Sequence, residues 1–152
     1  MQYNFSLSLL PGYAEFTSLF DQYRITKVMV TFIPMITAAY STTGIPGQIA
    51  TVIDYDDANA PASFDELRQY TNYKTVSLLK RHSRILVPAM ALAAYNGTFS
   101  GYASKKYQWL DSASPNIQHY GLKIGIQNCT LPTNTLLYDV EIKVNVEFKN
   151  IR

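Results

Sequence analysis

The chain has 152 residues, a formal net charge of +2 and 47% hydrophobic residues. This length and apolar content suit one domain with a sizeable core, spanning 1–152, and are too small for two independent domains. The charge is too small to act alone as a nucleic-acid footprint, so such a role needs a local basic cluster. The only cysteine, Cys129, excludes an intramolecular disulfide, and no apolar run reaches the length of a transmembrane helix, so membrane insertion is not expected.

The first part of the chain predicts two strands with a short helix between them. Residues 3–10 alternate apolar and polar side chains before Pro11-Gly12, which is typical of a strand that stops at a turn. Residues 14–22 carry aromatic and aliphatic side chains at helical spacing, which predicts a short helix over one end of a sheet. The β-branched and aromatic run 23–34 predicts a second, long strand.

The middle of the chain predicts a strand followed by a second helix. Residues 48–55 are rich in β-branched side chains and predict a strand. Ser63 and Glu66 form the capping-box pattern, in which the hydroxyl and the carboxylate satisfy free amides at a helix start. A helix is therefore expected near 64–71.

The next segments predict further strands. Residues 73–79 and 83–90 are interpreted as a pair of strands joined by a turn at 80–82. The run 95–102 is a weaker strand candidate, and 119–128 is a good one. No pattern of alternating strands and helices accompanies them, so antiparallel pairing is expected.

The last strand, 138–150, shows the most regular alternation in the chain. Its apolar row is expected to be buried, and the strand is expected to be long. The residues of this row are Tyr138, Val140, Ile142, Val144, Val146 and Phe148. Eight strands, uneven loops and two short helices together predict an all-β fold, an eight-stranded antiparallel jelly-roll sandwich with one or two short helices in the connections.

Few side chains offer catalytic or metal-binding chemistry. His82, His119 and Cys129 lie far apart in the sequence, and two histidines cannot supply the cluster of a cupin-type enzyme. No enzyme, cofactor or metal site is therefore expected. The acidic run 54–57 offers oxygen ligands for Ca²⁺, and the alternative is a solvated turn in which aspartates cap local amides. Its carboxylates belong to Asp54, Asp56 and Asp57.

Two basic runs are candidate nucleic-acid contacts. Phosphates favour such cations, and aromatic faces can stack on unpaired bases. The alternatives are a solvated hairpin turn for the first run and a packed aromatic anchor for the second. His82 is expected to add charge only at mildly acidic pH. The candidate residues are Lys80, Arg81, His82 and Arg84 in the first run, and Lys105, Lys106 and Trp109, beside Tyr107, in the second.

The order of several strand segments resembles one known family, the capsid proteins of circoviruses and related viruses with small circular single-stranded DNA genomes. The segment "FDQYRITKVMVTFIP" at 20–34 resembles the second strand of these capsids. No single segment is specific, since each is a generic strand, and the ordered set, which covers nearly the whole chain, carries the resemblance. The resemblance implies that the last strand is central in its sheet and that its apolar row forms a spine of the core. The further segments are "VIDYDD" (52–57), "YTNYKTV" (70–76), "LVPA" (86–89), "YQWLDS" (107–112), "YGLKIGIQN" (120–128) and "YDVEIKVNVEF" (138–148).

This resemblance implies a structural coat protein, not an enzyme, that self-assembles into a small icosahedral shell, or virus-like particle, around circular single-stranded DNA. Its implied partners are other copies of itself, the genome and an unknown host-cell receptor, and its implied locations are the virion and the host nucleus or cytoplasm during assembly. Family members usually begin with an arginine-rich arm that contacts the genome, whereas this chain begins "MQYNFSLS" at its first predicted strand.

Two other classes of jelly-roll protein fit the fold. A carbohydrate-binding module needs an exposed aromatic cleft, for which Trp109 with Tyr107 is the candidate. A trimeric cytokine-like ligand needs a signal segment or a disulfide, and neither is found. If the chain forms a shell, the loops 35–47 and 56–72 are the predicted subunit contacts or outer surface, because the two sheets occupy each other.

Overall fold

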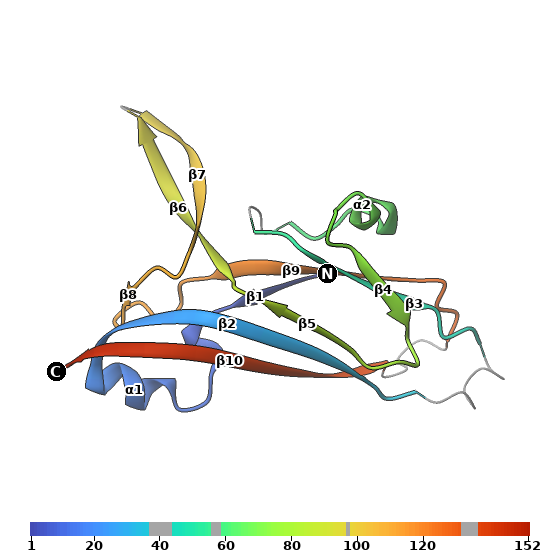
Figure 1. Ribbon diagram of the computed structural model, residues 1–152, viewed down its shortest axis with the longest axis horizontal. Coiled ribbons are helices and arrows are strands. Elements are labelled where there is room, and N and C mark those ends of the chain that lie inside the picture. The colour runs from blue at the N-terminus through green and yellow to red at the C-terminus, as the bar shows by residue number, and fades with distance from the viewer. Residues whose placement is uncertain (37–43, 56–58, 97, 132–136) are drawn as a thin grey trace.

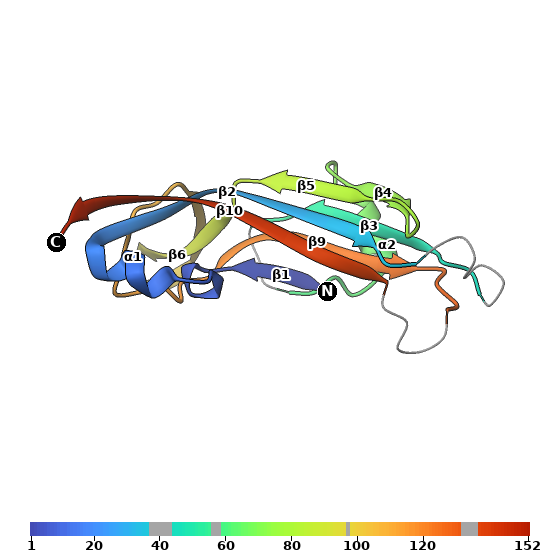
Figure 2. The ribbon, with the colours of Figure 1, turned by 90° about the horizontal axis from the view of Figure 1, so that it is seen from below.

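The computed structural model describes residues 1–36, 44–55, 59–96, 98–131 and 137–152, with side chains described for these except 93–102. The chain folds as two antiparallel β-sheets that face each other (Figures 1 and 2). The six-stranded sheet has the order β4-β3-β9-β6-β7, and β1 also pairs with β9. Its strands are β1 (Gln2–Phe5), β3 (Gln48–Ile53), β4 (Lys74–Ser77), β6 (Ala89–Asn96), β7 (Thr98–Lys106) and β9 (His119–Gln127).

The second sheet has four strands in the order β10-β2-β5, and β8 also pairs with β2. Among the described residues, three short helices lie in the connections. Two of them were expected from the sequence, and the third, a 3₁₀ helix, was not. This sheet contains β2 (Phe20–Pro34), β5 (His82–Leu86), β8 (Leu110–Asp111) and β10 (Tyr138–Ile151), and the helices are η1 (Leu7–Leu9), α1 (Tyr13–Leu19) and α2 (Phe64–Arg68). The fold is a mostly β sandwich of antiparallel sheets with few short helices, as the strand pattern predicted, with ten strands among the described residues where eight were expected.

The main core fills the space between the two sheets. Alternation along β2 turns Val28, Val30 and Phe32 inward, and each is at most 2% exposed. They pack against Leu122 and Ile124 of β9 in the opposite sheet. Burial of these branched side chains from both sheets supplies the hydrophobic stabilisation of the sandwich. No helix among the described residues is long and apolar enough to cross a membrane.

The position of the last strand differs from the prediction. β10 pairs with β2 from Tyr138 opposite Pro34 to Ile151 opposite Phe20, but β10 stands at one end of the sheet order and β2 is the inner strand. Most of the predicted spine packs against the core while staying only partly buried, and Ile142 is 41% exposed. The central position that the family resemblance implied for the last strand is therefore wrong, because similar strand segments do not by themselves fix which strands pair.

The strands predicted as a hairpin at 73–79 and 83–90 separate into different sheets. β4 pairs with β3, whereas β5 pairs with β2. The connection at 80–82 therefore crosses from one sheet to the other. Pro88, which has no amide donor, lies between β5 and β6, where the chain returns to the six-stranded sheet. Residues 95–102 fall in the β6–β7 hairpin, which projects from the sandwich in Figure 1.

The helix α2 covers the outer face of the six-stranded sheet. The predicted capping box forms, since the Ser63 hydroxyl accepts from the Glu66 amide at 3.1 Å and the Glu66 carboxylate accepts from the Ala62 amide at 2.6 Å. Gly125 permits the close approach, because a Cβ there would lie 2.7 Å from Leu67 Cδ1. Leu67 thereby packs in a small core of its own on β3.

Candidate functional site

The first predicted basic run does not form one exposed cluster. Lys80 and Arg81 are exposed in the crossing between the sheets, whereas His82 and Arg84 are 7% and 4% exposed. The reason is the alternation of β5, which turns His82, Arg84 and Leu86 toward the sandwich. The alternation of polar and apolar side chains in "HSRIL" was a sequence signal that could have told the buried His82 and Arg84 from the exposed Lys80 and Arg81.

His82 links the two sheets from inside the sandwich. Its Nε2 lies 2.7 Å from the Thr51 hydroxyl of β3, and its ring stacks on Phe32 with the centroids 6.1 Å apart. Burial lowers the pKa of His82, and the positive charges of Arg84 and Lys74 lower it further. His82 therefore takes up a proton only at a lower pH than an ordinary histidine does, and it does so in a buried position.

Arg84 closes one side of the sandwich. Its Nη2 donates to the Asn72 carbonyl at 2.9 Å, from the four-stranded sheet to the segment that leads into β4. The Asn72 side chain in turn pairs with the Ile53 backbone, donating to its carbonyl and accepting from its amide, both at 2.7 Å. The Asn72 side chain therefore continues the pairing of β3 just before β4 begins, and Arg84 connects this edge to β5.

A hollow opens at this edge, and we call it the edge pocket. Its volume is about 360 Å³. It has two cations, three hydroxyls, one carboxamide and two aliphatic side chains in its wall, and no carboxylate lines it. The lining residues are Ile53, Thr71, Asn72, Tyr73, Lys74, Ser83, Arg84 and Ile85.

The second predicted basic run is divided between two places. Lys106 Nζ lies 3.6 Å from the centroid of the Tyr55 ring. Trp109 instead lies beside cations of β2 and β10, with Arg24 Cζ 4.5 Å and Lys149 Nζ 4.3 Å from its ring centroid. Sequence reasoning missed these two cations because they are distant in the chain from the tryptophan. Lys105 is exposed.

Trp109 is partly buried and packs against the cations of β2 and β10. Its cation partners stabilise it by cation–π attraction, and Arg24 also forms an ion pair with Glu147 at 2.6 Å. Arg24 and Lys149 lie over the Trp109 ring, where a base or a sugar would have to stack. Contact of Lys105, Lys106 and Trp109 with nucleic acid stays a prediction.

The acidic run 54–57 begins with a buried ion pair. Asp54 Oδ2 lies 2.6 Å from Lys123 Nζ of β9 and accepts from the Tyr70 hydroxyl at 2.8 Å. Asp56 and Asp57 lie outside the described residues. Within the described ranges, no three His, Cys, Asp or Glu side chains are grouped so that they could hold a metal ion. His119 is buried, and its Nδ1 lies 3.1 Å from the Ile117 carbonyl.

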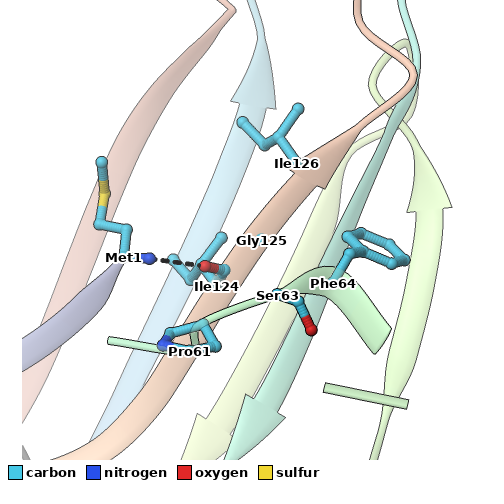
Figure 3. A pocket seen from close by; sticks show the side chains of 7 residues that line it. All are labelled: Met1, Pro61, Ser63, Phe64, Ile124, Gly125 and Ile126. Carbon is cyan, nitrogen blue, oxygen red and sulfur yellow. Dashed lines mark hydrogen bonds between the residues drawn. The ribbon is translucent and has the colours of Figure 1, made fainter. Parts of the chain in front are cut away.

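A second hollow of about 360 Å³ lies against the outer face of the six-stranded sheet (Figure 3). Figure 3 shows Met1 on one side and Phe64 of α2 on the other, with Ile124 between them. The Met1 amino group donates to the Ile124 carbonyl at 2.9 Å. The lining is mainly apolar and offers no charged side chain, so it presents no catalytic arrangement.

Comparison with known proteins identifies a family and a fold. A family model described as circovirus capsid protein matches residues 1–152. The crystal structure of the 60-mer BFDV capsid protein is similar with a TM-score of 0.68 at 19% identity, over 98% of this chain and 80% of that chain. The decameric BFDV capsid protein is similar with a TM-score of 0.60 at 17% identity, over 99% and 83%.

A plant virus protein shares the same fold. The red clover necrotic mosaic virus structure is similar with a TM-score of 0.57 at 18% identity, over 95% of this chain and 44% of that chain. This chain therefore spans less than half of that protein and about four fifths of the BFDV chains. No curated protein matches it in sequence. At these identities the similar structures establish the jelly-roll fold.

Proposed function

Because the chain belongs to the circovirus capsid protein family, we propose that many copies of it close into a small icosahedral shell around circular single-stranded DNA. The observation that supports this proposal most directly is the family match over residues 1–152. As a capsid protein, the chain has a structural role in the virion. The similar BFDV capsid protein was crystallised as a 60-mer and as a decamer, which supports assembly from a single kind of subunit.

The physical basis for shell formation is a sandwich with free edges. In the described part of the chain, β10 and β5 stand at opposite ends of the path β10-β2-β5. Large apolar side chains are exposed beside β10, with Leu9 at 68%, Phe16 at 47% and Ile142 at 41%. Exposed apolar groups of this kind favour contact with another subunit.

Contact with single-stranded DNA is the finer part of the proposal. Lys80 and Arg81 are exposed and form no ion pair among the described residues. If they face the inside of the shell, they neutralise phosphates without reading sequence. Attachment to a host-cell receptor through the loops 35–47 and 56–72, and passage through the host nucleus or cytoplasm during assembly, belong to the same proposal. Residues 37–43 and 56–58 of these loops lie outside the described residues.

The described part of the second loop has a partly structural role. α2 packs on the outer face of the six-stranded sheet, so residues 64–68 are part of the packed fold and do not form an exposed loop. The carbohydrate-binding alternative is not favoured, because its candidate Trp109 lies beside Arg24 and Lys149.

Negative-stain microscopy and sedimentation velocity of the purified chain test the proposal. We expect closed particles of uniform diameter that sediment as one large species. Nuclease treatment of particles followed by extraction should recover protected single-stranded DNA. Monomers or trimers under all conditions of salt and concentration would contradict shell formation, and empty particles after expression with the genome would contradict packaging by this chain.

A further inference from the structure

The edge pocket combines groups that bind oxyanions and lacks groups that repel them. Lys74 and Arg84 bring two positive charges, and Thr71, Tyr73 and Ser83 bring hydroxyls. Carboxylates, which would repel a phosphate, are absent from its wall. In contrast to the hollow of Figure 3, which is lined mainly by apolar groups, this one is polar and cationic.

Arg84 carries a buried charge without an ionic partner. The residue is 4% exposed, and its Nη1 is buried and has no hydrogen-bond partner. Its hydrogen bonds go to neutral oxygens of Asn72, and no carboxylate of the described residues pairs with it. Burial lowers its pKa, yet a guanidinium stays protonated at every physiological pH. Burying such a charge is costly unless an anion compensates it.

Lys74 places a second charge in the same wall. It begins β4, and its side chain is exposed. Its positive charge, like that of Arg84, lowers the pKa of the buried His82, so these groups share one local positive field. Arg84 is held in place by Asn72, and the exposed Lys74 lies in the same wall, so one anion with several acceptor oxygens can bridge the two cations.

From this combination of a carboxylate-free hollow, an unpaired buried guanidinium and a facing lysine, we propose that the edge pocket binds a tetrahedral oxyanion, a phosphate group. The occupant inside the particle is a backbone phosphate of the single-stranded DNA, and this identity rests on the proposed function. The pocket can equally take free inorganic phosphate, because both present the same oxygens. A planar guanidinium and an ammonium are the groups that proteins use for phosphate.

The test uses the purified particle in a buffer free of phosphate and sulfate. Inorganic phosphate is titrated while the ³¹P linewidth is followed, with ionic strength held constant by chloride. A fluorescein-labelled oligothymidylate is titrated separately by anisotropy, with and without inorganic phosphate. We expect saturable phosphate binding and weaker oligonucleotide binding when phosphate is present.

Three variants locate the binding. Lys74→Gln removes an exposed cation of the pocket and should weaken phosphate binding about fivefold. Lys27→Gln removes an exposed cation of β2, outside the pocket wall, and is the matched control, with phosphate affinity unchanged. Arg84→Gln should abolish phosphate binding, and its folding is checked by urea unfolding. If Arg84→Gln does not fold, the comparison of Lys74→Gln with Lys27→Gln still decides.

The outcomes distinguish a backbone phosphate from free phosphate, and they show whether the pocket binds phosphate at all. If phosphate displaces the oligonucleotide in wild type and not in Lys74→Gln, the pocket holds backbone phosphate. If phosphate binding depends on Lys74 while oligonucleotide binding does not, the pocket holds free phosphate. Equal phosphate affinity in Lys74→Gln and Lys27→Gln overturns the site. Lys74→Gln particles that fall apart with unchanged phosphate binding also overturn it and assign the pocket to a carboxylate of a neighbouring subunit.

Microscopy of the same samples distinguishes failure of the oxyanion site from failure of the proposed function. Intact wild-type particles without phosphate binding contradict the oxyanion site alone. A wild-type chain that forms no particles contradicts the proposed function, whatever the pocket binds.

Discussion

His82 and Thr51 join the two sheets of the sandwich, with the histidine Nε2 2.7 Å from the threonine hydroxyl. The contact is buried, and Thr51 has no exposed surface. Because β5 and β3 belong to different sheets, this is a polar link inside an apolar core. A buried polar contact of this kind is stabilising only while both groups remain satisfied.

The first prediction concerns pH. Burial lowers the pKa of His82 in the folded state, whereas the unfolded chain keeps the ordinary value near 6.5. As the pH falls below that value, the unfolded chain takes up a proton that the folded chain does not, so the free energy of unfolding decreases. We expect wild type to lose stability between pH 7.5 and 5, measured by urea unfolding.

Two variants test whether His82 causes this loss. His82→Gln keeps a polar side chain but cannot titrate, so its stability should depend less on pH over the same range. The pKa of His119 is also lowered, chiefly by burial, so part of the dependence should remain. Lys80→Gln, a change at an exposed neighbouring position, should behave as wild type. An unchanged pH dependence in His82→Gln would show that this residue does not couple folding to protons.

The second prediction compares two strands of the four-stranded sheet. Val30→Asp on the inner strand β2 would bury a charge at a side chain with no exposed surface, and it should cost several kcal/mol and prevent folding. Ile142→Asp on β10 changes a side chain that is 41% exposed and should cost about 1 kcal/mol or less. Val144→Asp should fall between them, since Val144 is partly buried against the core.

Soluble expression followed by urea unfolding measures all three changes. Val144→Thr is the matched control for Val144→Asp, because it keeps the branched shape without a charge. A stable, native-like Val30→Asp protein would contradict the inward orientation of β2. Equal effects of the three aspartates would contradict the edge position of β10.

Sequence periodicity predicted the strands well because alternation is a local property. The inward rows of 23–34 and 119–128 follow directly from which residues are apolar. Sheet membership did not follow, since 73–79 and 83–90 looked like a hairpin and pair with β3 and β2 instead. Strand partners are chosen by packing between residues far apart in the chain, which a single sequence does not display.

The candidate site shows the same division between local and distant information. Lys80, Arg81 and Arg84 were grouped by proximity in sequence, although the alternation of β5 buries only Arg84. Lys74 and Asn72 were not singled out, because they join Arg84 only when β4 and β5 meet at the open side of the sandwich. The cation partners of Trp109 were missed for the same reason.

The third prediction concerns the buried ion pair of Asp54 and Lys123. Their charged atoms lie 2.6 Å apart, with side chains 7% and 2% exposed. Removing one partner, in Asp54→Asn or Lys123→Met, leaves the other charge buried and should cost about 3–5 kcal/mol. The double variant should be less destabilised than the sum of the two, because no isolated charge remains.

A double-mutant cycle by urea unfolding measures this coupling. Tyr70→Phe removes the hydroxyl that donates to Asp54 and should cost about 1 kcal/mol, which gives a smaller reference change at the same place. The exposed pair of Arg68 and Asp65 is the control, and its cycle should show a much smaller coupling than that of the buried pair, because water screens the exposed charges. Additive effects of Asp54→Asn and Lys123→Met would contradict a coupled pair.

The last prediction concerns the exposed cations of the crossing between the sheets. If Lys80 and Arg81 face enclosed DNA, each phosphate that they neutralise releases counterions, and binding of single-stranded DNA weakens steeply with salt. Lys80→Ala with Arg81→Ala should therefore flatten the plot of log affinity against log salt by about one to two units, with little effect on sequence preference.

Arg84 is left unchanged in this variant, because its bond to Asn72 holds the sandwich edge and its loss would mix folding with binding. Filter binding of an oligothymidylate over a range of chloride concentrations gives the slope, and microscopy checks the particles. Lys27→Ala with Lys143→Ala, two exposed changes on β2 and β10, is the matched control for lost charge. Equal slopes in wild type and the Lys80/Arg81 variant, with damaged particles, would place these two cations at a subunit junction, where carboxylates of a neighbour such as Asp65 or Glu66 would pair with them. Equal slopes with intact particles would leave them as solvated charges.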